Sequence, residues 1–161
     1  MAGNRHGEYS ASYWGSSAPA TFVSLSSASW VGFAFNVSAP VNIQGFRAYV
    51  PGGCSPRMAV VWENAGPAVR AAWFDYSGAT SGWQQKWFRP WLLYNSSNDF
   101  RVAILMVGGY QRTANKFNSG SVLQNGILGI KGFQTTAADV LGATVTFNNN
   151  ANGVDILCAP I

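Results

Sequence analysis

The residues that could carry catalysis are few and widely spaced in this sequence of 161 residues. A hydrolytic triad needs a histidine that is oriented by a carboxylate beside a nucleophile, and the one histidine is His6, near the start of the chain. Glycoside hydrolysis needs only two carboxylates, and Glu63 and Asp75 are a pair that neighbouring strands could bring together. Isolated carboxylates on strands usually face solvent, so we expect the chain not to be an enzyme.

The sequence also lacks the usual cofactor-binding and metal-binding motifs. The glycines at 126, 129 and 132 do not have the spacing of a phosphate loop or a dinucleotide fingerprint, so no cofactor is expected. Two cysteines, Cys54 and Cys158, cannot form a zinc site of the usual composition, and we interpret them as buried thiols in preference to a disulfide. Calcium could be held by side chains among Asn148, Asn149, Asn150, Asn152 and Asp155, but calcium prefers sites richer in carboxylate, and we interpret the segment as a plain turn.

Tryptophans form the most regular pattern. Trp83, Trp87 and Trp91 are spaced by four and would share one face of a continuous strand, although Pro90 interrupts the register. Three interpretations stay open: core packing, a protein-contact patch with Trp and Arg89 as anchors, or a sugar-stacking platform. Aromatic and basic residues also alternate on single-strand nucleic-acid surfaces, but a net charge of +4 without basic runs argues against a nucleic-acid partner.

Period-two alternation predicts the elements that position these residues. Apolar residues alternate over 30–37, their parity shifts by one at Gly45, which predicts a bulge, and 100–107 is apolar on both faces, as in a central covered strand. The Asn152-Gly153 pair predicts a hairpin turn, and only 135–141 could form a helical turn.

About seven to nine short strands at regular spacing, without crossover helices, predict an all-β fold. We expect a single antiparallel β-sandwich, of jelly-roll or immunoglobulin-like type, over residues 30–161. Residues 1–29 contain eight serines and hold neither period, and we expect an extended arm that docks on the body or on a neighbouring subunit, with a frayed terminus as the alternative. Deleting residues 1–20 is then expected to weaken attachment and to leave the fold intact.

Composition indicates assembly. Charged residues make up only 10% of the chain, against about 25% in a typical soluble domain, and single basic residues such as Arg47 are expected to mark solvent faces of strands. The longest apolar run, 102–107, is far shorter than the roughly 20 residues of a membrane-spanning helix, so no membrane partner is expected. The start lacks the apolar stretch of a secretory signal, so we expect synthesis in a cytoplasm.

Several short segments together resemble a known family of domains. They are Gly45-Phe46-Arg47-Ala48-Tyr49, Val60-Val61-Trp62-Glu63, Ser81-Gly82-Trp83-Gln84 with Phe88 and Pro90, and Gly153-Val154-Asp155-Ile156-Leu157. Their order and spacing resemble a β-sandwich domain that recurs in virion proteins of tailed bacteriophages of actinobacteria, particularly minor tail proteins, and in some secreted polysaccharide-associated proteins. In that family the shared Trp and Gly residues are structural, so the resemblance implies no catalytic residue.

The resemblance implies a structural virion protein, made in the host cytoplasm. A single copy with an arm favours a head decoration protein on the capsid over a small tail-associated protein, with major capsid or tail proteins as partners. A homo-oligomer, for example a trimer, is expected. The alternative is a carbohydrate-binding module for host envelope glycans. The residues expected to contact a partner are Tyr9, Tyr13, Trp14, Trp83, Trp87, Arg89 and Trp91.

Overall fold

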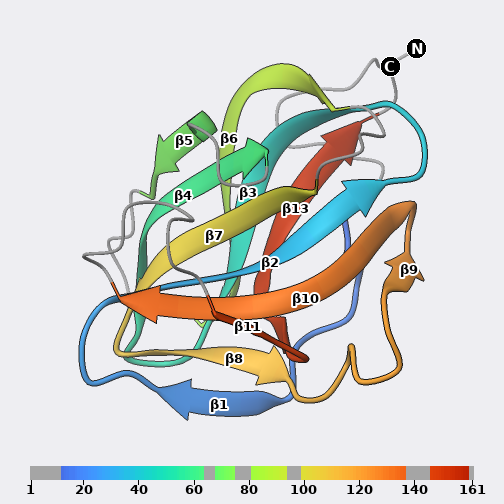
Figure 1. Ribbon diagram of the computed structural model, residues 1–161. Coiled ribbons are helices and arrows are strands. Elements are labelled where there is room, and N and C mark those ends of the chain that lie inside the picture. The colour runs from blue at the N-terminus through green and yellow to red at the C-terminus, as the bar shows by residue number, and fades with distance from the viewer. Residues whose placement is uncertain (1–11, 64–67, 75–80, 94–98, 137–145, 160–161) are drawn as a thin grey trace.

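The computed structural model describes residues 12–63, 68–74, 81–93, 99–136 and 146–159. Every regular element within those ranges is a β-strand, and every strand pair is antiparallel. The sheets pack against one another in a sandwich-like arrangement (Figure 1). The predicted all-β fold and antiparallel sandwich are therefore confirmed.

The strands follow one another with short connections. In chain order they are β1 (Thr21–Ser24), β2 (Ser29–Val37), β3 (Val41–Val50), β4 (Ser55–Glu63), β5 (Ala68–Trp73), β6 (Gly82–Leu93), β7 (Phe100–Val107), β8 (Gly109–Thr113), β9 (Val122–Gln124), β10 (Ile127–Thr136), β11 (Thr146–Asn148), β12 (Ala151–Asn152) and β13 (Val154–Ala159).

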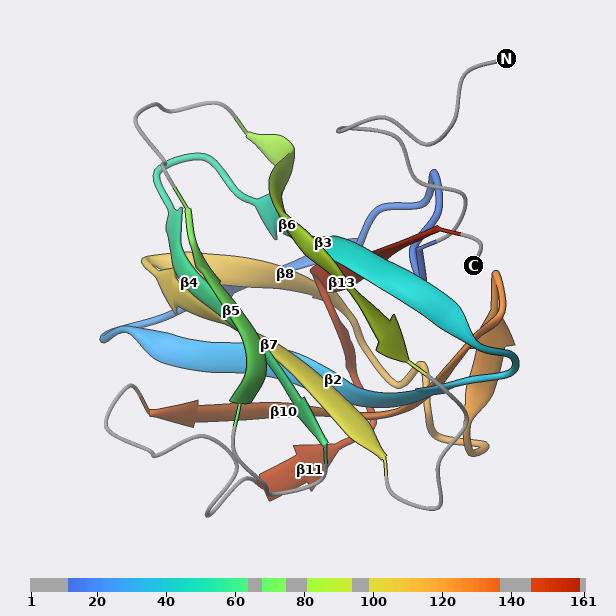
Figure 2. The same ribbon diagram turned by 90° about the horizontal axis from the view of Figure 1, so that it is seen from above.

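Two layers enclose the core. A seven-stranded sheet has the order β11-β10-β2-β7-β4-β5, with β9 added beside β10, and it crosses the front of Figure 1. A three-stranded sheet, β13-β3-β6, lies behind it, and the view from above in Figure 2 separates the two layers. The third sheet, β1-β8-β12, lies at the lower end of the molecule in Figure 1.

Alternation along β2 accounts for the main core. Val31, Phe33 and Phe35 point into the space between the layers and are almost completely buried, as the period-two pattern predicts. Burying each such side chain stabilises the fold by roughly 1.5–3 kcal/mol. The predicted central strand is also confirmed, because β7 lies between β2 and β4 and is followed directly by Gly108, whose φ is +89°.

The outer face of the seven-stranded sheet carries a second, smaller cluster. Trp62 and Phe133 form its centre, with their rings 6.1 Å apart, and both are buried. Trp30, from the outward-facing set of β2, packs in the same cluster. Strand β2 is thus buried on both faces, so only its ends are available to a partner.

The predicted bulge at Gly45 is confirmed. The pairing of β3 with both β13 and β6 passes from Ile43 to Gly45 and skips one residue. A Cβ at Gly45 would lie 2.5 Å from the carbonyl oxygen of Lys86, so the close approach of β6 requires glycine here.

The predicted hairpin at Asn152-Gly153 is wrong. Gly153 connects two sheets instead, because β12 pairs with β8 whereas β13 pairs with β3. A hairpin does form at the other Asn-Gly pair, Asn125-Gly126, between β9 and β10. Both of its residues have positive φ, +53° and +81°, as a type I′ turn requires.

Two further expectations concern chain ends and helices. The first two residues of the predicted helical turn, Thr135 and Thr136, belong to β10, and residues 137–141 lie outside the described residues.

The packing also does not separate residues 12–29 from the body, since β1 pairs with β8 and Tyr13 and Trp14 are buried. The expected boundary at residue 30 is therefore corrected for the described part of the arm.

Candidate functional site

A buried ion pair lies at the junction of the sandwich and the first described residues. Asp155 of β13 is completely buried, and its Oδ2 accepts hydrogen bonds from Arg47 Nε at 3.1 Å and Arg47 Nη2 at 2.9 Å. Arg47 is opposite Asp155 in the pairing of β3 with β13, and it is only 3% exposed. The expectation that Arg47 marks a solvent face is therefore wrong.

The ion pair binds residues 12–17, which we call the N-terminal latch. The backbone N–H groups of Tyr13 and Trp14 donate to the two Asp155 oxygens at 2.8 and 3.0 Å. Arg47 Nη2 donates to Ser12 Oγ at 3.0 Å and to the carbonyl oxygen of Gly15 at 2.6 Å. One buried pair thus satisfies polar groups of a segment more than 100 residues distant from Asp155.

Aromatic rings complete the docking of the latch. The Trp83 ring lies 4.0 Å from the Arg47 guanidinium carbon and 6.1 Å from the Trp14 ring. Trp14 Nε1 donates to the carbonyl oxygens of Asn152 and Val154, both at 3.1 Å. The Tyr13 ring lies 5.1 Å from Phe33, inside the main core. Tyr13 and Trp14 are therefore core residues of their own chain, which corrects their assignment to a partner surface.

The electrostatics of the pair fit a structural role. Burial raises the pKa of Asp155, and Arg47 with the two latch N–H groups opposes that shift. The carboxylate is fully buried and its oxygens already accept bonds from the latch and from Arg47, so it has no access to a substrate in solvent. We therefore assign Arg47 and Asp155 to docking of the latch, not to acid-base chemistry.

The Tyr13 hydroxyl differs from the polar groups of the latch described above. It is buried and has no hydrogen-bond partner among the described residues. Burial raises the pKa of Tyr13 to about 12, and the charge of Asp155 acts in the same direction. Below pH 10 the hydroxyl is neutral in both the folded and the unfolded protein. Between pH 10 and 12 the hydroxyl ionises in the unfolded protein first, so the folded state loses stability as the pH rises.

Replacing Tyr13 with Phe is expected to raise the free energy of unfolding by about 1 kcal/mol at pH 7, because an unpaired buried hydroxyl is removed. It should also remove the part of the stability loss between pH 10 and 12 that ionisation of the Tyr13 hydroxyl causes. Urea unfolding at pH 7 and pH 11 measures both effects. Tyr110→Phe is the matched control, since the Tyr110 hydroxyl donates to Gln134 at 2.8 Å and its loss should destabilise. A less stable Tyr13→Phe at pH 7 would contradict the assignment.

The tryptophan series does not form one row. Trp83 and Trp87 lie opposite Tyr49 and Gly45 in the pairing with β3, and the Trp83 ring lies against Trp14 of the latch. Trp91 lies opposite Ile43, because the register of β6 shifts next to Pro90, and both Trp83 and Trp91 pack against the main core. Arg89 is exposed on the same strand, whereas Tyr9 lies outside the described residues. A platform of three stacked rings, which the glycan-binding alternative used, is thus not formed.

The other sequence candidates are placed as follows. Glu63 ends β4, while His6 and Asp75 lie outside the described residues. Cys54 and Cys158 are both buried and are not joined by a disulfide, and burial raises the pKa of each thiol. In the asparagine-rich segment, Asn148 Oδ1 accepts a hydrogen bond from the N–H of Asn150, and Asn149 Nδ2 donates to Asn118 Oδ1.

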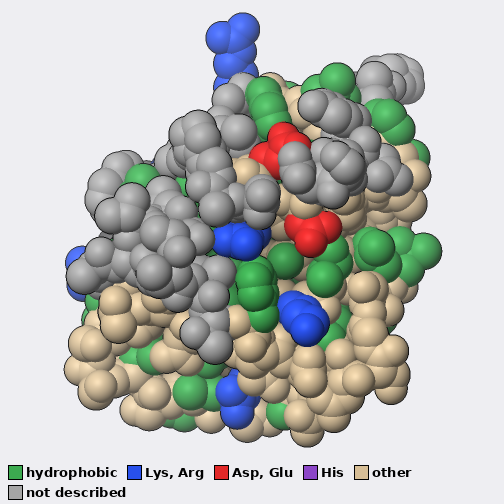
Figure 3. Space-filling model, viewed as in Figure 1, with side chains coloured by type: hydrophobic (Ala, Val, Ile, Leu, Met, Phe, Trp, Pro, Cys, Tyr) green, Lys and Arg blue, Asp and Glu red, His purple; other side chains and the backbone are tan. Residues whose placement is uncertain are grey.

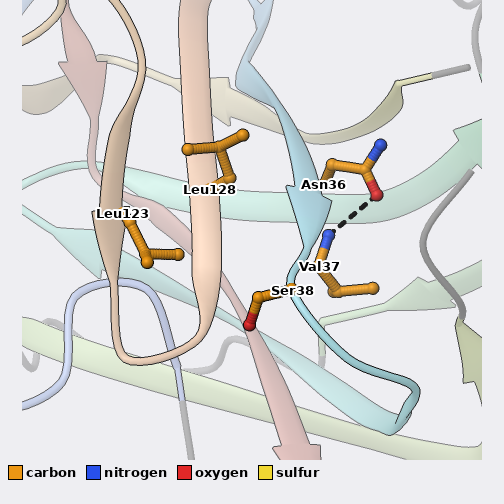
Figure 4. Close-up of a pocket in the computed structure, with 5 residues that line it drawn as sticks. All are labelled: Asn36, Val37, Ser38, Leu123 and Leu128. Carbon is orange, nitrogen blue, oxygen red and sulfur yellow. Dashed lines mark hydrogen bonds between the residues drawn. The ribbon is translucent and has the colours of Figure 1, made fainter. Parts of the chain in front are cut away.

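An open pocket lies on the outer face of the seven-stranded sheet, near the end of β2. It has a volume of about 330 Å³ and is lined by Asn36, Val37, Ser38, Leu123 and Leu128 (Figure 4). Strand pairing positions its walls, because Leu128 of β10 is opposite both Leu123 of β9 and Asn36 of β2. Three neighbouring strands thus contribute one row of side chains to the pocket.

The polar side chains that line the pocket form hydrogen bonds with nearby backbone groups. Asn36 Oδ1 accepts from the N–H of Val37 at 2.8 Å, and Ser38 Oγ donates to the carbonyl oxygen of Gly126 at 3.1 Å. Ser38 therefore holds the β9–β10 turn from one side, while Asn125 Nδ2 on the same turn donates to the carbonyl oxygen of Ser12 at 3.0 Å. The turn thus connects the pocket to the N-terminal latch.

The pocket is apolar at its rim. Leu123 is 59% exposed, the most exposed of the large hydrophobic side chains described. Figure 3 shows hydrophobic side chains toward the edge where β9 lies, with acidic and basic side chains beside them. The sequence pattern did not reveal this surface, although Leu123 and Leu128 flank an Asn-Gly pair in a stretch without charge, residues 117–130.

Within the described ranges, no three His, Cys, Asp or Glu side chains lie together where they could hold a metal ion. The same residues include no helix that is long and apolar enough to cross a membrane.

Comparison with known proteins places the chain in a family. Neither the curated proteins nor the solved structures contain a match. A family model, described as a domain of unknown function (DUF4082), matches residues 16–152, which include β1 to β12. Because the match covers most of the sequence, the chain belongs to the DUF4082 family.

Proposed function

We propose that the chain is a structural protein of a tailed-phage virion, which attaches to capsid or tail proteins through the pocket face. The observation that carries the proposal is the exposed aliphatic rim of the pocket, with Leu123 at 59% exposure on a chain with only 10% charged residues. Exposed apolar surface next to a pocket is typical of protein-contact sites.

The rest of the molecule supports a binding role. Asp155 and Arg47, the most deeply buried charges described, dock the latch, which accepts a hydrogen bond from Asn125 in the turn beside the pocket. Arg89 and Trp87, which are expected from the sequence to contact a partner, lie on β6 in the other sheet and so are not part of the pocket face. The resemblance of the segments around Arg47, Trp83 and Asp155 to virion sandwich domains gives the class of assembly.

Co-sedimentation tests the proposal. Purified protein is mixed with separated heads and tails of the phage that encodes it, and we expect binding at a fixed ratio to one of them. Leu123→Asp should weaken binding at least about tenfold, because burying an unpaired charge in an apolar contact is costly; a tenfold loss corresponds to about 1.4 kcal/mol. The matched control is Leu92→Asp on β6, since Leu92 is 47% exposed.

Two results would contradict the virion role. One is a folded protein that binds neither heads nor tails, and the other is a coding sequence outside any head or tail gene cluster. Binding of array glycans that Trp87→Ala abolishes, at an unchanged melting temperature, would favour the carbohydrate-binding alternative instead.

A further inference from the structure

Strand β9 is an edge strand at the periphery of the molecule. Within the described strands it pairs with β10 alone, through Val122, Leu123 and Gln124. Figures 1 and 2 both place β9 at the outside of the sandwich, next to the start of β10. Its second edge therefore presents main-chain N–H and C=O groups to which another strand can be added.

The β9 edge lacks the features that usually protect edges. Proteins block pairing of edge strands with charged side chains or proline, and β6, an edge of the three-stranded sheet, contains Lys86, Arg89 and Pro90. By contrast, residues 117–130, which include β9 and its turn, contain no charged residue and no proline.

The side chain at the middle of β9 is the most exposed large hydrophobic group described. Leu123 is 59% exposed and continues a row that runs through Leu128 to Asn36 on one face of the sheet. An aliphatic side chain at this position is stabilised by an apolar side chain on an added strand, at a Cβ separation of about 4.5–5.5 Å.

We propose that the β9 edge pairs with the β9 edge of a second copy of this chain. The two strands run antiparallel about a two-fold axis, with Leu123 of one copy opposite Leu123 of the other. The proposal deepens the proposed function, on which it rests, because lateral pairing at the β9 edges would place two pocket faces side by side on one continuous sheet.

The charge pattern favours a second copy as the occupant. A two-fold contact brings each residue near its own counterpart, so any charge at the contact would meet a like charge. The chain has a net charge of +4, which opposes self-association over most surfaces, but residues 117–130 contribute none of it. An uncharged edge with one central leucine is complementary to itself. Pairing would join two seven-stranded sheets and align the leucine pair Leu128 and Leu123 of one copy with that of the other.

Cross-linking of a Leu123→Cys variant tests the contact directly. The native cysteines are 5% and 1% exposed, so they should give little background. Directly opposed residues of antiparallel strands have the separation that a disulfide needs. Under mild oxidation we expect a covalent dimer that forms at least about tenfold faster than that of the matched variant Leu92→Cys, because pairing holds the two thiols at a high effective concentration.

Sedimentation equilibrium provides the second measurement. Wild-type protein should form dimers at high concentration, and Leu123→Lys should abolish them while Leu92→Lys leaves them unchanged; melting temperatures should match in all variants. Equal cross-linking of Leu123→Cys and Leu92→Cys, or a wild-type protein that stays monomeric, would overturn the proposal. Both measurements are made without virions, so dimers without virion binding refute only the virion role, and virion binding without dimers refutes only the β9 contact.

Discussion

Replacing Asp155 with Asn is expected to lower the free energy of unfolding by about 3 to 5 kcal/mol, because it leaves the buried Arg47 charge without its counter-charge. Asn has nearly the shape of Asp, but its amide group directs N–H donors toward the guanidinium or toward the latch N–H groups, where acceptors are required. Chemical denaturation at pH 7 measures the loss. Faster hydrogen exchange at the amides of Tyr13 and Trp14, which donate to Asp155, should accompany it.

A surface aspartate supplies the control for this substitution. Asp99 is exposed, so Asp99→Asn should stay within about 0.5 kcal/mol of the wild-type stability. If Asp155→Asn is as stable as Asp99→Asn, the Arg47–Asp155 pair does not hold the latch, and the docking described above is wrong.

Removing residues 1–17 should have an even larger effect, and the structure reverses the sequence-based expectation that the fold survives loss of the arm. Trp14 and Tyr13 are buried, and losing an aromatic side chain from a core costs about 3 to 5 kcal/mol. Two such losses approach the total stability of a typical domain, about 5 to 15 kcal/mol. We expect the truncated protein to be unfolded or to melt at least about 15 °C lower than the full chain.

Complementation in trans distinguishes a lost docking contact from a general defect. A synthetic peptide of residues 12–20 added in excess should raise the melting temperature of the truncated protein, because the Asp155 acceptors and the Trp14 site remain on the body. The same peptide with Trp14→Ala should have little effect. Full stability of the truncated protein without any peptide would show that the latch contributes little to the core.

Local patterns predicted those parts of the fold that depend on neighbouring residues. The strands at 29–37 and 100–107 follow from alternation and from a continuous apolar run, and the bulge at Gly45 follows from a change of parity. The hairpin was placed at the wrong Asn-Gly pair. The sequence contains two such pairs, and Asn152 is used instead to donate from its side chain to the carbonyl oxygens of Gly32 and Phe133.

The candidate sites could not be predicted in the same way, because they depend on distant pairs. Arg47 and Asp155 are 108 positions apart, and each looks like a single solvent-facing charge on a strand. The Tyr13-Trp14 pair looks like an exposed arm until Asp155 provides acceptors for its N–H groups. The pocket needs three strands in register, and Leu123 and Leu128 show a pattern only after the turn between them is known.

The span of the latch contact has a consequence for biosynthesis. The Tyr13 N–H bonds a carboxylate that is 142 positions further along the chain, so the contact cannot form until β13 has left the ribosome. During translation the indole of Trp14 stays in water, and closure of so long a loop delays the final folding step. Residues 12–17 are thus synthesised early but are among the last to pack. A nascent polypeptide that stops short of residue 155 cannot complete its core.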